Sequence, residues 1–149
     1  MKKILPLILL TLVVAAGCST ASKAVKKDSE EISFEYVALT RGAYKKIIVK
    51  QDTVITIHDR EMKNVMTKGL KNGDWNKLLA ELDKVNAENI SELKAPSNRS
   101  HADAALAASL KIIRKDKTYE SNTFDHGNPP TELREIVSTI IAVSDLENK

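Results

Sequence analysis

From residue 32 onward the chain shows a period of two. In the run ISFEYVA, residues 32–38, every second residue is apolar, the pattern of a strand with one buried face. Residues 44–49 (YKKIIV) and 54–59 (VITIHD) are rich in β-branched residues and predict two further strands. The sequence therefore predicts three consecutive strands joined by short turns.

The register between the second and third strands has two solutions. A two-residue turn at 51–52 pairs Ile47 with Thr56, whereas a three-residue loop pairs Ile47 with Ile57. We favour the second register because it places apolar residues opposite one another on one face.

Two segments show helical periodicity. The first follows Asp74, a good N-cap residue, and runs to about Asn86; the second begins at Leu133 and ends near Val143. The single tryptophan, Trp75, lies on the apolar face of the first helix, where we expect a core anchor.

Residues 102–114 fit both a strand and a helix. Apolar residues alternate from Leu106 to Ile112, but Leu106, Leu110 and Ile113 also fit helical spacing. The following segment favours a β-hairpin, because 115–117 (KDK) has turn character and 118–124 (TYESNTF) is poor helix material.

The predicted order is thus β-β-β-α-β-β-α. Strand runs followed by helices indicate an α+β fold. We expect one domain, residues 32–149, with an antiparallel sheet of about five strands and both helices on one face.

The corner before the last helix, DHGNPP at 125–130, is the least ordinary stretch. Gly127 is expected at positive φ, with Asp125 or Asn128 supplying side-chain hydrogen bonds. Pro130 suits the first helical position. Because prolines lack the N–H group that binds anions at a helix N-terminus, we expect a stiff corner and not an anion site.

The first residues form a different pattern. Lys2 and Lys3 precede an apolar run, residues 4–16, about 20 Å long as a helix and shorter than the ~30 Å hydrocarbon core. Residues 1–17 are therefore interpreted as a secretory signal peptide. Ala15-Ala16-Gly17-Cys18 resembles the lipobox of bacterial lipoproteins, with Ala15 replacing the more usual leucine.

This resemblance implies cleavage after Gly17 and acylation of Cys18 on its sulfur and its new amine, with fatty acids such as palmitate. Such an anchor would hold the protein on a membrane permanently. The alternative is an ordinary signal peptide and a free thiol. Residues 18–31 are small, polar and mixed in charge, which predicts a flexible tether.

The part of the chain beyond the lipobox resembles small lipoproteins of unknown function from Gram-negative bacteria. Ser19 is not the aspartate that commonly retains lipoproteins in the inner membrane. The resemblance implies an outer-membrane destination, with the domain in the periplasm or at the cell surface.

Charge and cysteine content narrow the classes of function. Without Lys2 and Lys3 the chain has 21 basic and 20 acidic residues, a formal net charge of +1, which argues against a nucleic-acid partner. Cys18 is the only cysteine, so with it acylated we expect no disulfide and no thiolate metal site.

Candidate chemistry is limited to histidine-aspartate pairs. No nucleotide loop, HExxH, GxSxG or CxxC motif occurs. If the hairpin forms, His101 and Asp103 precede its first strand and Asp125 and His126 follow its second. These four side chains are candidates to converge as a zinc or copper site or as an acid-base pair.

We therefore expect a lipid-anchored cell-envelope protein with a non-catalytic binding or scaffold domain that contacts an envelope protein. No cofactor is expected. The alternative is a metal-binding or hydrolytic envelope domain that uses the histidine-aspartate cluster, and a carrier of a hydrophobic ligand would require a cavity.

Overall fold

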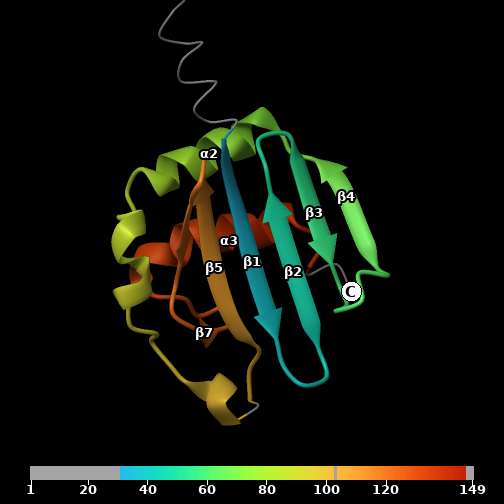
Figure 1. Ribbon diagram of the computed structural model, residues 1–149, viewed down its shortest axis with the longest axis vertical. Coiled ribbons are helices and arrows are strands. Elements are labelled where there is room, and N and C mark those ends of the chain that lie inside the picture. Colours follow the sequence, from blue (N-terminus) through green and yellow to red (C-terminus); the bar gives the residue numbers. More distant parts are fainter. Residues whose placement is uncertain (1–30, 103, 147–149) are drawn as a thin grey trace, which may run out of the picture.

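A single antiparallel sheet forms the centre of the computed structural model, which describes residues 31–102 and 104–146 (Figure 1). The strand order is β4-β3-β2-β1-β5-β6, and β7 also pairs with β5. The strands are β1 (Ile32–Leu39), β2 (Tyr44–Val49), β3 (Thr53–Ile57), β4 (Val65–Gly69), β5 (Ala107–Arg114), β6 (Lys117–Glu120) and β7 (Phe124–Asp125).

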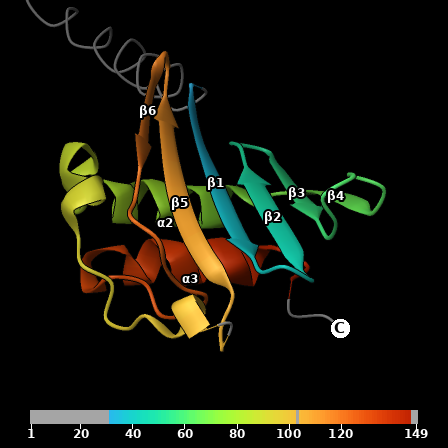
Figure 2. The ribbon, with the colours of Figure 1, turned by 60° about the horizontal axis from the view of Figure 1, so that its bottom comes forward.

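Both α-helices of the described part lie on the same face of this sheet. Figure 2 shows α2 (Asn72–Leu82) and α3 (Arg134–Val143) side by side beneath it. The described residues also contain short 3-10 helices, which are η1 (Ala87–Glu92), η2 (Arg99–Ala102) and η3 (Thr131–Leu133). The predicted α+β class, with helices on one face of an antiparallel sheet, is confirmed.

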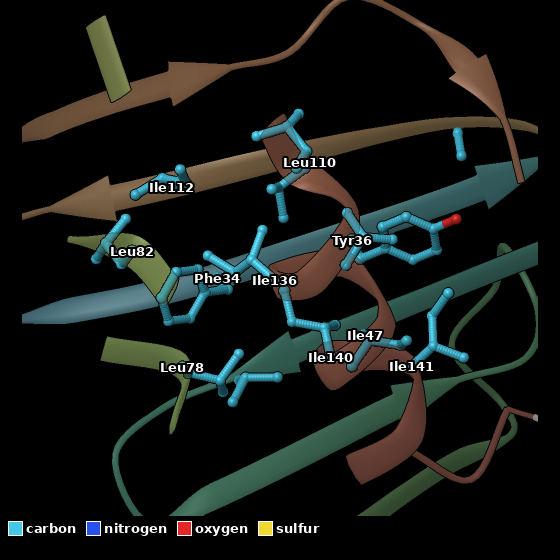
Figure 3. Close-up of a cluster of buried hydrophobic side chains, with 14 of the residues drawn as sticks. Phe34, Tyr36, Ile47, Leu78, Leu82, Leu110, Ile112, Ile136, Ile140 and Ile141 are labelled. Atoms are coloured by element: carbon cyan, nitrogen blue, oxygen red, sulfur yellow. The ribbon is translucent and has the colours of Figure 1, made fainter. Parts of the chain in front are cut away.

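The core lies between the two helices and the sheet. Apolar side chains from alternate positions of the central strands meet the apolar stripes of both helices, as expected for a half-buried sheet. Trp75 is 3% exposed, and its ring meets that of Phe34 edge-on at 6.0 Å, so its predicted anchoring role is confirmed. Figure 3 shows the centre of this cluster: Phe34, Tyr36, Ile47, Leu78, Leu82, Leu110, Ile112, Ile136, Ile140 and Ile141.

The sheet has more strands than predicted, because β4 and β7 were missed. Every residue of β4 is exposed, and its apolar residues Val65 and Met66 are adjacent instead of alternating, so the strand leaves no period-two signal. β7 has only two residues. The observed order is β-β-β-β-α-β-β-β-α.

The favoured β2–β3 register was wrong. Ile47 pairs with Thr56 and Val49 with Val54, around a two-residue turn closed by hydrogen bonds between Lys50 and Thr53. Thr56 is fully buried, because its hydroxyl accepts a hydrogen bond from the backbone N–H of Asp145.

The boundaries of α2 also differ from expectation. The helix begins at Asn72, with Lys71 at the N-cap position, so Asp74 lies in the first turn, where its charge favours the helix dipole. The helix ends at Leu82 instead of near Asn86. Asn86 instead caps η1, its side chain accepting a hydrogen bond from the Glu88 N–H.

Residues 107–114 form a strand, which decides between the two interpretations of that segment. β5 and β6 make the predicted hairpin, in which Arg114 pairs with Lys117. Lys115, in the turn of this hairpin, has a φ of 54°.

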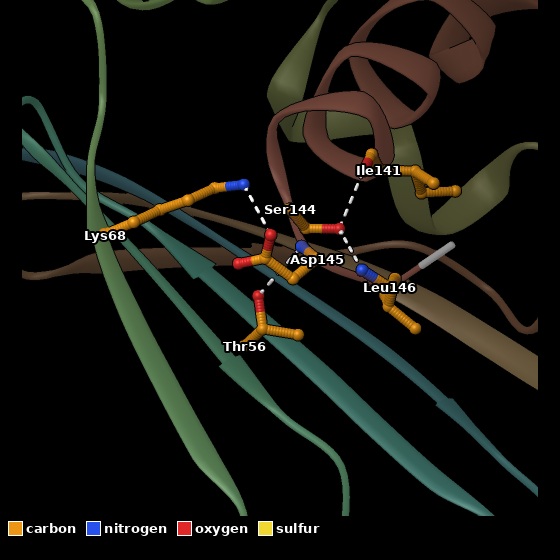
Figure 4. Close-up of polar contacts among 6 residues, drawn as sticks. All are labelled: Thr56, Lys68, Ile141, Ser144, Asp145 and Leu146. Atoms are coloured by element: carbon orange, nitrogen blue, oxygen red, sulfur yellow. Dashed lines mark hydrogen bonds and ion pairs between the residues drawn. The ribbon is translucent and has the colours of Figure 1, made fainter. Parts of the chain in front are cut away.

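The C-terminal end of α3 is fastened to β3 and β4 (Figure 4). The Lys68 ammonium lies 2.8 Å from Asp145, whose N–H donates to Thr56 at 3.4 Å. The Ser144 hydroxyl donates to the carbonyl of Ile141. Asp145, which follows α3, therefore ties β3 and β4 to the helix layer.

The predicted signal peptide (1–17), Cys18 and nearly all of the predicted tether (18–31) lie outside the described residues, as does Asp103. None of the helices in 31–102 and 104–146 combines the length and apolarity that crossing a membrane requires.

Candidate functional site

Asp125 organises the segment that precedes β5. Its side chain is 3% exposed and accepts hydrogen bonds from the Ser97 hydroxyl, the Arg99 N–H at 2.9 Å and the Ser100 N–H at 2.7 Å. The hydrogen bond from Ser97, reinforced by those from Ser100 and Arg99, holds the pKa of Asp125 well below its usual range.

The corner that follows Asp125 is built as a rigid turn. Gly127 has a φ of 77°, as predicted, and the Asn128 amide donates to the Ser97 hydroxyl at 2.7 Å. Pro130 is the N-cap of η3 and not the first helical residue. Both predicted side chains, Asp125 and Asn128, therefore make hydrogen bonds here.

His126 belongs to a different environment. Its Nδ1 lies 2.7 Å from the hydroxyl of Tyr36, and the two rings are 5.8 Å apart. Burial raises the pKa of Tyr36, although the backbone of Gly127 opposes this shift. The hydroxyl therefore keeps its proton, which it donates to Nδ1 in the neutral tautomer that carries the imidazole proton on Nε2.

His101 is exposed at the rim of a polar depression of about 370 Å³. The depression is lined by Ala95, Pro96, Ser97, Asn98, Ser100, His101 and Thr123. Asp125 thus meets the loop that carries His101, but its carboxylate is bound by Ser97, Arg99 and Ser100 of that loop.

The three candidate residues that the structure describes, His101, Asp125 and His126, are not grouped to hold a metal ion. Asp125 binds the 97–100 loop, His126 binds Tyr36, and Asp103 lies outside the described residues. Within 31–102 and 104–146, no group of three or more histidine, cysteine or acidic residues is placed to hold a metal ion.

Hydrolysis would need a base to activate a nucleophile. The Ser97 hydroxyl donates its proton to Asp125 and accepts a hydrogen bond from Asn128. A carboxylate with a strongly lowered pKa is a weak base, so this arrangement orders the loop and does not activate Ser97.

A third histidine-aspartate pair occurs in the sequence, His58 and Asp59, and its aspartate has a structural role. The Asp59 carboxylate accepts hydrogen bonds from the N–H groups of Lys63 and Asn64, and these bonds lower its pKa. Asp59 therefore orders the β3–β4 loop.

The largest uncovered feature is the sheet face turned away from α2 and α3, here called the outer face. Within the described residues, no helix packs on it. Its apolar residues are Val37, Leu39, Ile48, Ile55, Ile57 and Ile113, which alternate along their strands with core residues.

One pair of these six side chains is directly adjacent across strands. Ile48 pairs directly with Ile55, and Lys46 stands between Val37 and Ile57. All but one of the six are half-buried; Ile57 is 4% exposed. The outer face is consequently more apolar than the alternation of a one-sided sheet requires.

Ion pairs lie among the apolar side chains of the outer face. Lys46 lies 2.8 Å from Glu35, and Lys111 lies 3.4 Å from Glu120. Near Tyr44 the loop after β3 folds back, placing the Arg60 guanidinium 5.7 Å from the centre of the Tyr44 ring. The outer face is therefore a mixed surface, an apolar patch that the Lys46–Glu35 ion pair interrupts.

Sequence reasoning assigned the solvent-facing side of β1 to polar residues and so overlooked this patch. The signal was present, because Val37 and Leu39 make the second half of β1 apolar at every position. Such continuous runs indicate burial on both faces.

Comparison with known proteins adds no function for this geometry: the chain matches no protein-family model and no curated protein sequence.

Proposed function

We propose that this protein is a lipid-anchored cell-envelope protein whose domain binds a protein partner through the outer face, without catalysing a reaction. One observation carries the binding function. Within the described residues the sheet is covered by helices on one face only, and the uncovered face carries half-buried apolar side chains on β1, β2 and β3, with Ile48 directly opposite Ile55.

The chemistry of the described surface supports binding over catalysis. The buried carboxylate of Asp125 is used to hold the 97–100 loop, and His126 is bonded to Tyr36. Apolar side chains on an uncovered sheet face are removed from water when a complementary surface covers them.

The anchor in this proposal rests on the lipobox-like residues before Cys18. We propose export, cleavage after Gly17 and attachment to the outer membrane by acyl chains on Cys18. Cells expressing the full chain should incorporate labelled palmitate, and Cys18→Ser should abolish the label. Labelling of the Cys18→Ser variant would contradict the anchor without affecting the binding surface.

Site-specific photo-crosslinking in cells tests the binding surface. A photoreactive amino acid is placed at Ile48 or Ile55 on the outer face, or at Lys77, an exposed control on α2. We expect one shared adduct at Ile48 and Ile55 and none at Lys77, since only the outer face is covered by the partner.

The variant Ile48→Lys, read from the probe at Ile55, should eliminate the adduct, because it places a charge in the centre of the patch and leaves the core intact. Adducts of equal yield at all three probe positions, or no adduct at Ile48 and Ile55, would contradict the proposal.

A further inference from the structure

The backbone of β4 presents unpaired hydrogen-bonding groups along the edge of the sheet. The Leu70 N–H donates to Asp52 and the His58 N–H donates to Asn64, and the register Thr53↔Gly69 continues between these two pairs. Even-numbered residues of β4 therefore bond to β3. The N–H and C=O groups of Val65, Thr67 and Gly69 point outward.

The opposite edge of the sheet is protected. β6 is short and carries Lys117 and Glu120, and η1 lies beside it. Short, charged or covered strands are the usual ways to prevent edge-to-edge pairing. Only the β4 edge of the described sheet lacks a neighbour.

β4 itself lacks such protection. It contains no proline, and Val65 and Met66 are 45% and 44% exposed. Its single charge, Lys68, is turned to Asp145 on the helix side. An exposed apolar edge of this kind is a template for strand addition.

We infer that the β4 edge pairs with the β4 edge of a second copy of this chain. The two strands run antiparallel about a two-fold axis at Thr67, so the two sheets join into one. This inference does not rest on the proposed function, because it uses the outward backbone groups of β4 and not the apolar side chains of β1, β2 and β3.

The register centred on Thr67 satisfies every outward group of the strand. Thr67 stands opposite its own copy, and Val65 stands opposite Gly69, whose missing side chain leaves room for the valine. Each of these pairs exchanges two backbone hydrogen bonds. Threonine pairs across strands are favourable, and the symmetric contact is self-complementary.

Charge is compatible with this pairing. Met66 stands opposite Lys68, so the lysine stem packs on the thioether while its ammonium stays with Asp145. No two like charges face each other within the five-residue strand.

A contact made by one five-residue strand from each copy is small compared with the ~1,200 Å² of the smallest stable interfaces. We therefore expect a dimer that is populated at high protein concentration and dissociates on dilution. Anchoring of both copies in one membrane would raise their effective concentration.

The test is the association state of the full chain in detergent, followed by sedimentation velocity over a concentration series. We expect monomer at low and dimer at high concentration. Hydrogen exchange should slow at the amides of Val65, Thr67 and Gly69 as dimer forms, while the amide of Thr118 keeps its rate.

Thr67→Pro removes an outward donor without breaking the β3–β4 ladder and should weaken association more than about tenfold. The matched control is Thr118→Pro. Because the Ser121 N–H bonds to Leu110 of β5, Thr118 also points its N–H outward, but from the protected edge. The association of the Thr118→Pro variant should therefore equal that of the parent chain.

Charge variants at Thr67 test the same strand pairing without introducing a proline. Thr67→Lys and Thr67→Glu place like charges opposite each other, so each alone should be monomeric, while their mixture should form the dimer. A parent chain that stays monomeric, a dimer insensitive to Thr67→Pro, or a mixture that fails to associate would overturn the inference.

Discussion

At the scale of single residues, the buried carboxylate of Asp125 binds more backbone N–H groups than any other described side chain near the corner. Three donors from the 97–100 loop converge on it. Because the donors are fixed by folding, the ionised form is favoured in the native protein and the pKa is lowered. A charge therefore holds a loop that contains little apolar surface.

Asp125→Asn should lower the stability of the protein at neutral pH, since an amide cannot accept from all three donors. The lowered pKa means that the unfolded chain binds more protons below about pH 4. The stabilisation by Asp125 is thus complete above that pH and is lost as the pH falls further.

Urea unfolding at pH 7 and at successively lower pH values measures this effect. The difference between the parent chain and Asp125→Asn should be largest at pH 7 and shrink below about pH 4. Ser97→Ala, which removes one donor, should cost less at pH 7. A difference that stays constant with pH would show that the carboxylate charge is not responsible.

At the scale of elements, the corner between β7 and η3 depends on one backbone conformation. Gly127 has a φ of 77°, and a Cβ built at this position meets no atom within 4 Å. Any penalty for a side chain therefore comes from the backbone and not from a clash.

Gly127→Ala should reduce the free energy of unfolding by about 1 kcal/mol because of the left-handed conformation. Gly42 in the β1–β2 turn is the matched control, since its surroundings are equally empty and its φ is not positive. Gly42→Ala should be neutral or stabilising by about 0.5 kcal/mol. Thermal unfolding of both variants would separate strain from steric effects, and equal losses would contradict this assignment.

The same corner shows what local sequence can predict. Gly127 and Asn128 predict the turn, because the conformational freedom of glycine and the hydrogen bonds of asparagine are local properties of the sequence. The register of β2 and β3 was not predictable in this way, since Thr56 is buried through a contact with Asp145, 89 residues away. β4 was missed because none of its residues is buried.

For the candidate histidine-aspartate cluster, the sequence predicted the topology and not the partners of the side chains. Topology does bring Asp125 to the loop before β5, as the hairpin implied. The next residue, His126, does not share this environment. Its side chain contacts Tyr36, a residue 90 positions away. Such partners follow from tertiary packing and leave no local pattern.

At the scale of the whole molecule, one core unites both helices with the sheet. Ile140 of α3 is fully buried in the cluster that includes Phe34 and Leu78. Trp75 of α2 belongs to the same cluster and is the only tryptophan. We therefore expect helices and sheet to unfold together.

Ile140→Ala should cost about 2–5 kcal/mol of stability, and Ile48→Ala on the half-buried outer face about 1 kcal/mol. Urea transitions followed by circular dichroism and by Trp75 fluorescence should coincide in both variants. Separate transitions would show that α2 and the sheet are independent units.

The position of β1 has a consequence for how the chain folds. The first strand of the described domain is central: β2 pairs along one side and β5 along the other, with Ile32 opposite Arg114. The meander β1 to β4 can form from local contacts, but the second side of β1 stays unpaired until residues 107–114 arrive. We therefore expect the slow step of folding to be the closure of a long loop that brings β5 to β1.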